Sequence, residues 1–383
     1  MKRFICILLL GMFLACSEED ALPPTEVKDW YVITPTENMD EVDEAIYHLY
    51  EKYNKAVFYK DTIGSEDRGW KDENGNPKLY YEVLRLSYDM TESNNIQTKI
   101  TYTPADVSTP ESKKAMLPLL ELMDEKLFAW IEGADVHVPA VLIVQDMERA
   151  KKPLYVYRGF GVLGFALNCF EQKNADSLIQ RTFLHEVCYV ALQENLSTYQ
   201  DIVINAFENN TSASPAVAKE CWGVNYETFV PSYVSWLTSV NNLQVYANMK
   251  LQYEQQKEEA LEQLKNENLT EETKLSSAEM MLTFVEGKLG NYDEYKANLE
   301  LYCPENFGLL GLTQGKVGDK LAYFVPTAVE DFAAYLDAML DYSEEEFKAK
   351  YEKYPLVQAR YILVQHVLKN AGFDIQRIRS EID

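Results

Sequence analysis

The sequence predicts an α+β fold, in which strands fill the first half of the chain and helices the second. Two observations lead to this prediction. Branched and aromatic side chains crowd residues 80–88 and 138–145, as is typical of strands. Residues 226–302, in contrast, repeat apolar side chains at helical spacing almost throughout. Because the two kinds of element are segregated along the chain, one α+β domain at 38–383 with a helical insertion at about 240–302 is the simplest arrangement.

The first half also contains helical segments and irregular stretches. Apolar residues at helical spacing predict a helix at 39–54 and another at 112–131, whose first turns Pro118 trims or kinks. Residues 66–78 are polar and predict a loop or a hairpin. Three glycines interrupt residues 155–168, which therefore predict bent or bulged strands.

Capping and breaking residues divide the second half into helices. Ser177, with Gln180 three residues on, fits a capping box for a helix at about 177–194. Residues 251–268 are heavily charged around a thin stripe of leucines and predict a solvated helical hairpin. The other predicted boundaries are a capping box at Ser343 and Glu346, a break at Pro355, and helix ends at Gly287, Gly290 and Gly372.

The N-terminus predicts export and lipid attachment. A charged MKR precedes an apolar stretch that is too short to span a bilayer, as in a signal peptide at 1–15. Phe13–Cys16 resembles a bacterial lipobox, so Cys16 is expected to be the first mature residue and to carry palmitate with other acyl chains. Several acyl chains anchor a protein stably. An ordinary secretory peptide with a chance cysteine is the alternative.

The residues that follow the lipobox extend this prediction. The stretch 16–37 is rich in proline and acidic residues, as is typical of a flexible tether. Its start, Ser17–Asp20, resembles the surface-export signal of lipoproteins from Gram-negative gut anaerobes. The protein is therefore expected to be held in the outer membrane by the lipid on Cys16 and to be exposed at the cell surface.

The chain is strongly acidic, with 61 acidic and 36 basic residues and a formal net charge of −25. This balance argues against nucleic acid as a partner, because a phosphate backbone repels such a surface. Four cysteines remain besides the one in the lipobox, and they lack the paired C-x-x-C spacing of a zinc knuckle. Most of them are expected to be free, buried thiols: Cys169, Cys188, Cys221 and Cys303.

A histidine and a glutamate interrupt an apolar run at 183–192, FLHEVCYVAL. In the motif HExxH two histidines at i and i+4 share a helix face and bind zinc, and the glutamate activates the zinc-bound water. Here His185 and Glu186 begin the motif, but position i+4 is Tyr189. Burying an ionisable group costs free energy unless the group is paired or bound to a metal. His185 and Glu186 therefore form a buried pair with hydrogen-bond partners, lie on a solvent-exposed helix face, or are the remnant of a metal site.

The order of several segments resembles the substrate import-associated zinc metallohydrolase lipoproteins, which lie beside outer-membrane nutrient transporters. The resemblance covers roughly residue 40 to the end. The segments are EAIYHLYEKYNKAVFYKD, VPAVLIV, GFGVLGFALN, TFLHEVCYVAL, YETFVPSYVSWL, LAYFVPTAVEDFAAYL and the closing YPLVQARYILVQHVLKNAGFDIQRIRSEI. It implies a zincin-like metallopeptidase fold, with His185 as first zinc ligand, Glu186 as general base and the pair Glu330-Asp331 as source of a further ligand, placed on Glu330.

Two departures from the family put zinc binding in doubt. Tyr189 replaces the second histidine, and a phenol with a pKa of about 10 is a poor ligand at neutral pH. Ala334 replaces the last acid of an EDFAE-like motif. Cys188, at i+3 from His185, is a candidate substitute ligand because a thiolate suits zinc, although free cysteines usually pack in cores.

Three functions remain open from the sequence. In the first, the protein has lost catalysis and its cleft binds a glycan, a peptide or a transporter partner during nutrient uptake. In the second, it is an active zinc metallopeptidase with an atypical ligand. In the third, it is a surface scaffold whose helical insertion holds other proteins.

Overall fold

The structure is a computed structural model that describes residues 28–86, 100–138, 140–159, 161–265 and 271–382. The predicted signal peptide at 1–15, Cys16 and the first part of the predicted tether lie outside these residues. Within them, no helix combines the length and the apolar character needed to cross a bilayer.

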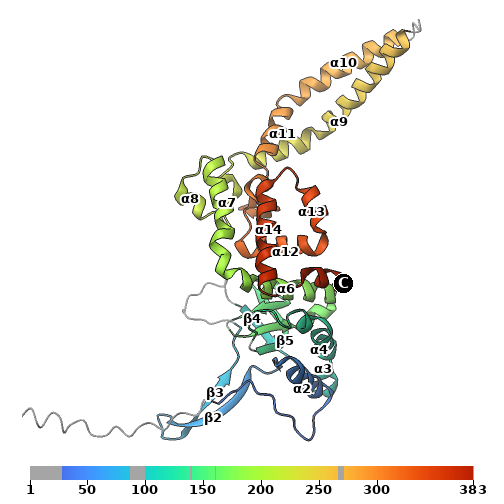
Figure 1. Cartoon of the computed structure of the whole chain (residues 1–383). Helices are drawn as coiled ribbons and strands as arrows, with labels where there is room; N and C mark the ends of the chain where they lie inside the picture. Colours follow the sequence, from blue (N-terminus) through green and yellow to red (C-terminus); the bar gives the residue numbers. More distant parts are fainter. Residues whose placement is uncertain (1–27, 87–99, 139, 160, 266–270, 383) are drawn as a thin grey trace, which may run out of the picture.

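A six-stranded mixed sheet lies at the centre of the molecule (Figure 1). Its strands are β1 (Ala56–Phe58), β4 (Ile100–Pro104), β5 (Ala140–Arg149), β6 (Lys152–Pro153), β7 (Val156–Arg158) and β8 (Leu163–Ala166). β5 pairs in parallel with β1 on one side and with β8 on the other, and β7 pairs antiparallel to β8. β4 and β6 pair antiparallel to the second half of β5.

Alternate side chains of β5 face two different cores. Val141 and Ile143 belong to the main core, whereas Leu142 and Val144 belong to a smaller core on the opposite face. All of them are buried, which explains why the strand reads as a continuous apolar run. The buried strand predicted at 138–145 is thus confirmed.

The helices of the main core lie against one face of the sheet or against one another. They are α2 (Glu41–Tyr53), α3 (Pro110–Lys114), α4 (Leu117–Leu122), the π-turn η1 (Met123–Leu127), α5 (Phe128–Trp130), η2 (Leu167–Glu171), α6 (Ala175–Leu192), α12 (Ala328–Asp341), α13 (Glu344–Lys350), α14 (Pro355–Asn370) and α15 (Ile375–Glu381). The interior of this layer is continuous, because side chains from α2, α6, α12 and α14 pack in one cluster.

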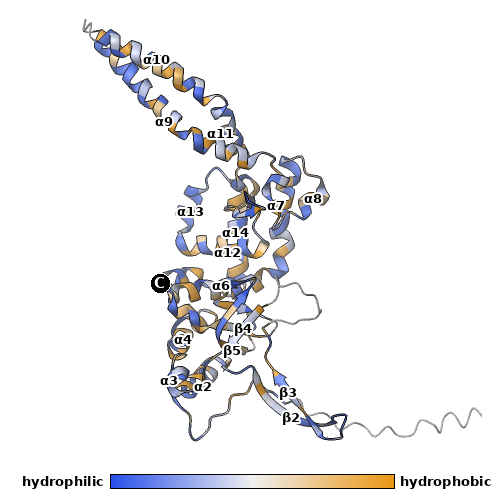
Figure 2. Ribbon diagram, turned by 180° about the vertical axis from the view of Figure 1, so that it is seen from behind, coloured by the Kyte–Doolittle hydropathy of each residue, from blue (hydrophilic) through white to orange (hydrophobic). Residues whose placement is uncertain are grey.

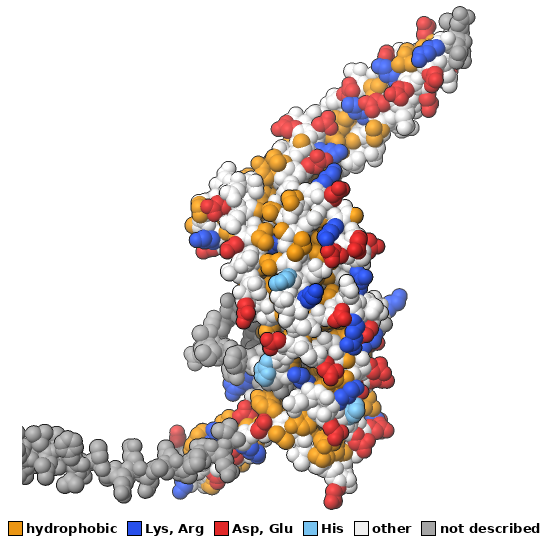
Figure 3. Space-filling model, in the orientation of Figure 1, with side chains coloured by type: hydrophobic (Ala, Val, Ile, Leu, Met, Phe, Trp, Pro, Cys, Tyr) orange, Lys and Arg blue, Asp and Glu red, His pale blue; other side chains and the backbone are white. Residues whose placement is uncertain are grey.

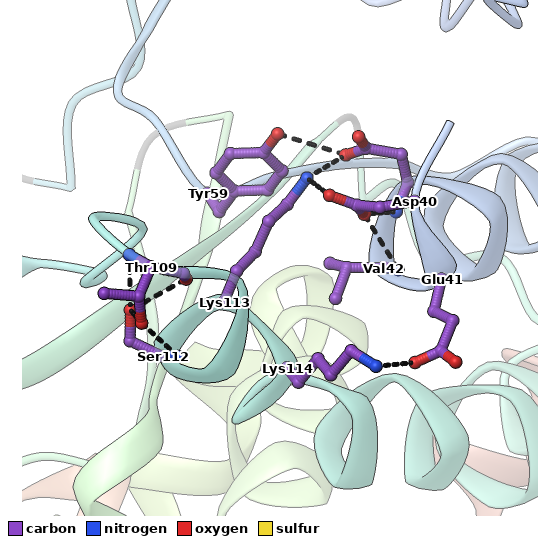
Figure 4. A network of polar contacts seen from close by, with 9 residues as sticks. Asp40, Glu41, Val42, Tyr59, Thr109, Ser112, Lys113 and Lys114 are labelled. Atoms are coloured by element: carbon purple, nitrogen blue, oxygen red, sulfur yellow. Dashed lines mark hydrogen bonds and ion pairs between the residues drawn. The ribbon is translucent and has the colours of Figure 1, made fainter. Parts of the chain in front are cut away.

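A polar network ties α2 to α3 and to the end of β1 (Figure 4). Lys113 donates to Asp40 and to Asp43, both at 2.7 Å, and the Tyr59 hydroxyl donates to Asp43 at 3.0 Å. Burial alone would lower the pKa of Lys113, but these partners outweigh it and raise the pKa above its ordinary value. Lys114 adds an ion pair to Glu41 at 2.8 Å, so two short helices are held on the sheet by charge as well as packing.

A second core supports the region from which a helical arm leaves the body. It is built from apolar side chains of α7 (Leu196–Asn210), α8 (Pro215–Lys219), η4 (Tyr226–Thr228) and η5 (Pro304–Phe307), with Tyr323 of β10 (Lys320–Phe324) packed against it. The short helix η3 (Gln193–Asn195) precedes α7, and β9 (Thr313–Val317) forms a hairpin with β10. Phe207 stacks on Phe307 with ring centroids 4.5 Å apart. Figure 3 shows apolar side chains gathered where the arm joins the body.

The arm is a long helical hairpin that projects from one end of the body (Figure 1). It consists of α9 (Tyr233–Leu264), α10 (Glu271–Leu289) and α11 (Tyr292–Leu301). Ion pairs join α9 and α10 at Lys250–Glu286 and Lys257–Glu279. Buried apolar side chains between them are few, and Figure 2 shows hydrophilic and hydrophobic residues interspersed along both helices. The solvated helical hairpin predicted for this region is confirmed.

At the other end of the molecule, β2 (Thr62–Lys71) and β3 (Pro77–Val83) form a second projecting hairpin. It occupies the stretch predicted as a loop or hairpin, and neither strand has a fully buried residue. The strand predicted at 80–88 is confirmed only up to Val83, since β3 ends there and residues 87 and 88 lie outside the described ranges.

The α+β class and the helical second half are confirmed, and several boundaries are confirmed with them. The predicted helix at 39–54 is α2, and the segment at 112–131 breaks at Ala115–Met116, just before Pro118, into α3 and α4. The predicted capping box of Ser343 and Glu346 begins α13. Gly290 and Gly372 follow helix ends with positive φ.

Three details of the prediction are wrong. α6 begins at Ala175, so Ser177 does not cap it, and Gln180 is completely buried. Gly287 lies inside α10 instead of ending a helix. No element was predicted at 196–219, where α7 and α8 form.

Candidate functional site

The predicted metal-binding residues lie where α6 crosses α12. Side chains 181, 185 and 189 of α6 meet side chains 341, 337 and 332 of α12, which shows that the two helices run antiparallel. The opposite side of α6 carries Phe183, Leu184, Val187 and Cys188 into the main core. Helical spacing therefore leaves His185 and Tyr189 on the partly exposed side. We call His185, Glu186, Tyr189, Arg181 and Asp337 the His185 site.

His185 is bonded to a carboxylate that the sequence analysis did not single out. Its Nε2 lies 2.9 Å from Oδ1 of Asp337, and 23% of the histidine side chain is exposed. Arg181 donates to the same oxygen at 3.1 Å and to Asp341 at 2.6 Å. Burial alone would raise the pKa of Asp337, but His185 and Arg181 outweigh it and hold the pKa below its ordinary value.

Glu186 points away from Asp337, toward the edge strand β7. One of its carboxylate oxygens accepts the backbone N–H of Arg158 at 3.0 Å. The Arg158 guanidinium in turn donates to the carbonyl oxygen of His137 at 2.6 Å. Burial raises the pKa of Glu186 above its ordinary value, although the Arg158 N–H and the charge of His185 oppose the change. Glu186 is thus a partly desolvated acid held against the sheet.

The two neighbouring candidates, Tyr189 and Cys188, are occupied by packing. The Tyr189 ring contacts Phe332 edge to face, with centroids 5.6 Å apart, and burial raises the pKa of its phenol. Cys188 is fully buried in the main core, and burial raises the pKa of its thiol far above the ordinary value. A zinc-binding thiolate has to lose its proton, so this environment disfavours Cys188 as a ligand.

The structure does not bring Glu330 to His185. Glu330 accepts the N–H and the hydroxyl of Thr327 at 2.8 and 2.9 Å, and Thr327 caps the Glu330 N–H in return. It is the N3 residue of the α12 capping box, a local role. Asp337, which does reach His185, lies seven residues further along α12, or about 10 Å by the helical rise.

Asp331, the other acid of the predicted pair, is buried in a different network. It is 1% exposed and accepts from the Arg360 guanidinium at 2.5 Å and from the Tyr199 hydroxyl at 2.6 Å. Arg360 also donates to the Gly308 carbonyl at 2.7 Å and lies 3.8 Å from the centroid of the Tyr199 ring. This pair ties α12 to α14 inside the core, so it serves the fold.

Ala334 lies between the two contacts that α12 makes with α6. Phe332 meets Tyr189 on one side of it, and Asp337 meets His185 on the other. Ala334 is exposed on the same helical stripe as Glu330 and Asp337. Tyr189 contacts Phe332, two residues before Ala334 on α12.

The residues present do not fit a catalytic zinc site. Such a site takes three protein ligands and keeps a fourth position for water. Here the one imidazole is bonded to Asp337, while Glu186 and Glu330 are bonded to backbone groups elsewhere. Among the residues that the structure describes, no three or more histidine, cysteine, aspartate or glutamate side chains are grouped to hold a metal ion.

Arg181 and Asp337 are the residues of this site that sequence reasoning missed. Arg181 stands four residues before His185, and Asp337 seven residues after Glu330, so both share a helix face with a predicted site residue. This spacing could have identified both residues as candidates from the sequence. It could not show that they pair with each other across two helices.

Comparisons with protein-family models, with curated proteins and with solved structures each find no match to this chain. The structure shows a mixed α+β architecture with a helical second half, and a hydrogen bond between His185 and Asp337 where α6 crosses α12.

Proposed function

We propose that this protein is a surface-exposed lipoprotein of the outer membrane, anchored through Cys16, which retains a zincin-like fold but has lost catalysis. It binds a glycan, a peptide or a transporter partner during nutrient uptake. The observation that carries the proposal is the 2.9 Å contact between His185 and Asp337. It supports a site in which the imidazole that binds metal in the family is instead hydrogen-bonded to a carboxylate, which Arg181 also contacts.

The neighbouring substitutions support the same proposal. A second nitrogen donor is replaced by Tyr189, whose ring packs on Phe332, and the acid position between the two helix contacts is Ala334. Asp337 contacts both Arg181 and His185, and all three side chains keep some solvent, so these polar groups have partners without a metal. No reaction step is needed to account for these contacts.

Zinc titration of the purified mature protein tests the proposal. We expect well under one equivalent of zinc per chain, measured by calorimetry and by metal analysis after dialysis. The double variant Tyr189→His, Ala334→Glu should gain zinc, because it returns a nitrogen and a carboxylate to one face of the crossing. Tyr189→Phe with Ala334→Gln is the matched control and should gain none.

Two results would count against the proposal. Stoichiometric zinc on the unmodified protein that disappears in His185→Ala would show a working metal site. A well-folded double variant that gains no zinc would show that the α6–α12 crossing does not have the geometry of a metallohydrolase.

An active zinc metallopeptidase is the second candidate function. Glu186 favours it, because its raised pKa and its place beside His185 suit a general base. Cleavage of casein or of a peptide library, lost on Glu186→Gln and on chelation, would establish it.

A surface scaffold is the third candidate. Exposed apolar side chains on the arm favour it, namely Leu251, Met280 and Phe284. A variant that lacks residues 245–290 should then lose a partner that the full chain retains, with the thermal unfolding of the body unchanged.

A further inference from the structure

A small polar cavity lies at the end of the central sheet where β1 and β5 begin, outside the His185 site. We call this end of the sheet its edge. The volume of the cavity is about 280 Å³. β1 and β5 both begin at this edge, because their parallel register pairs Ala56 with Ala140. Among the residues that line the cavity, those with polar groups are Asp29, Tyr31, Tyr50, Asn54, Lys55 and His137.

Lys55 is the unusual member of this lining. It is half-buried, and no hydrogen bond or ion pair joins its ammonium to any residue within the described ranges. Burial lowers its pKa from the ordinary value. Acidic residues outnumber basic ones by 61 to 36 in this chain, so a lysine without a carboxylate partner is unexpected. A desolvated charge of this kind is stabilised by a counter-ion.

A second cation lies close to the same edge. The Arg158 guanidinium donates to the carbonyl oxygen of His137 at 2.6 Å, and burial lowers the pKa of Arg158. Lys55 precedes β1 and Arg158 ends β7, so the two cations flank the segment that leads into β5. Glu186 lies against Arg158 and Asp29 lines the cavity, so the Lys55 ammonium supplies the positive charge with which an anionic group in the cavity would pair.

The rest of the lining is suited to hydroxyl groups and to a ring. Asp29 already accepts the N–H of Tyr31 at 2.9 Å through one oxygen, and its second oxygen can accept from a ligand hydroxyl. Asn54 offers an amide beside it. Tyr31 and Tyr50 also line the cavity, and a tyrosine ring can pack against the apolar face of a sugar. A simple carboxylate would use only Lys55, and a neutral sugar would leave Lys55 unpaired.

We propose that this cavity binds a carboxylated sugar of the hexuronate class, either free or as the terminal residue of an acidic polysaccharide. The carboxylate pairs with Lys55, the ring hydroxyls bond to Asp29 and Asn54, and the pyranose ring lies against a tyrosine. The volume is at the lower end of the range for small-ligand pockets, which suits a single sugar residue. The site goes beyond the proposed function, because it does not involve the His185 site and stands whether or not zinc binds there.

Calorimetry and NMR titration of the purified mature protein test this site with five probes: D-galacturonate, D-glucuronate, trigalacturonate, D-galactose and acetate. We expect at least one hexuronate to bind, with D-galactose and acetate each at least tenfold weaker. Lys55→Met should weaken hexuronate binding at least tenfold, because it removes the ammonium group and keeps a side chain of similar length. Lys55→Arg should stay within about threefold of the unmodified protein, since it keeps the charge.

The matched control is Lys173→Met, which removes an exposed lysine elsewhere and should leave affinity unchanged. Circular dichroism and thermal unfolding verify that each variant is folded. Trigalacturonate binding as tightly as the monosaccharide identifies a polysaccharide end as ligand, and binding of the monosaccharide alone identifies the free sugar.

Three results would overturn the inference. They are no binding of either hexuronate or of trigalacturonate to the folded protein, equal binding by Lys55→Met, and acetate binding as tightly as galacturonate. None of these results depends on zinc content, so they are separable from a failure of the proposed function.

Discussion

Ionisable side chains near α6 are each held by a partner from a distant part of the chain. Asp337 is 152 residues from His185, and the Arg158 N–H that Glu186 accepts is 28 residues away. These partners determine the free-energy cost of burying each ionisable group. His185 and Asp337 are hydrogen-bonded to one another at a partly exposed crossing, whereas Glu186 has only a backbone donor and stays partly desolvated.

Glu186→Gln is therefore expected to stabilise the protein at neutral pH. Burial raises the pKa of Glu186, so the folded state binds this proton more tightly than the unfolded state does. The stability from this group is present at low pH and is lost as pH rises through the folded-state pKa. A glutamine keeps the acceptor for Arg158 without the charge, and we expect a gain of up to about 1 kcal/mol at pH 7.

Urea denaturation between pH 4 and pH 8 measures this effect. The advantage of Glu186→Gln should shrink as pH falls toward 4, because the glutamate becomes increasingly protonated in both states. Glu51→Gln changes an exposed glutamate of α2 and should have no comparable effect. A Glu186→Gln protein that is less stable at pH 7 would mean that the carboxylate charge is needed for the fold.

Helices differ in how much of the main core they support. α12 and α14 are joined by the buried Asp331–Arg360 pair, and breaking such a pair typically costs about 3–5 kcal/mol. The arm is different, because α9 and α10 bury few side chains, among them Ala260, Leu282 and Val285. Its stability therefore depends more on helix propensity and on surface ion pairs.

Gly287→Ala is expected to stabilise the arm. Gly287 lies inside α10, and no atom lies within 4 Å of a methyl group placed there. Alanine should add about 1 kcal/mol to the local stability of the helix. Gly290→Ala is the matched control and should destabilise by a similar amount, because Gly290 has a φ of +49°.

Amide hydrogen exchange in α10 measures both variants. Protection should rise in Gly287→Ala and fall in Gly290→Ala, while α14 should be unchanged in both. Equal exchange in the two variants would show that the arm opens only together with the body.

The start of the described chain and the helical arm lie at opposite ends of the molecule. The described chain begins at Lys28, whose ammonium lies 3.9 Å from the centroid of the Trp30 ring, and Trp30 packs directly on Gly64 of β2. The arm leaves from the opposite end of the body (Figure 1). If Cys16 carries lipid, the twelve-residue separation allows Lys28 to lie no more than about 40 Å from it.

Cys16→Ser is expected to move the protein from the membrane fraction to the soluble fraction. The reason is that acyl chains supply the anchor, and no helix in the described part of the chain is suited to span a bilayer. Fractionation and palmitate labelling of expressing cells measure the change. Cys303→Ser, at a free and half-buried thiol, should remain in the membrane fraction. A soluble unmodified protein would contradict the predicted anchor.

Much of the fold was predictable because it is written in local patterns. The helix at 39–54 follows from its apolar spacing and the buried strand at 138–145 from its composition. The mostly free, buried cysteines follow from the absence of paired spacing. These features depend on neighbours within a few residues. The helix at 196–210 was not predicted, although its buried residues Tyr199, Val203, Ala206 and Phe207 follow helical spacing. Phe207 stacks on Phe307, about a hundred residues away.

The sequence by itself determined the class of the fold, the helical hairpin, the half-complete HExxH motif and the face of α6 on which His185 lies. Only the tertiary structure decided the partners. It placed Asp337 against His185, left Glu330 as a helix cap and buried Asp331 on Arg360. The physical reason is that helical periodicity sets the direction of each side chain, whereas a contact between α6 and α12 depends on how two helices pack. No pattern of neighbours encodes that packing.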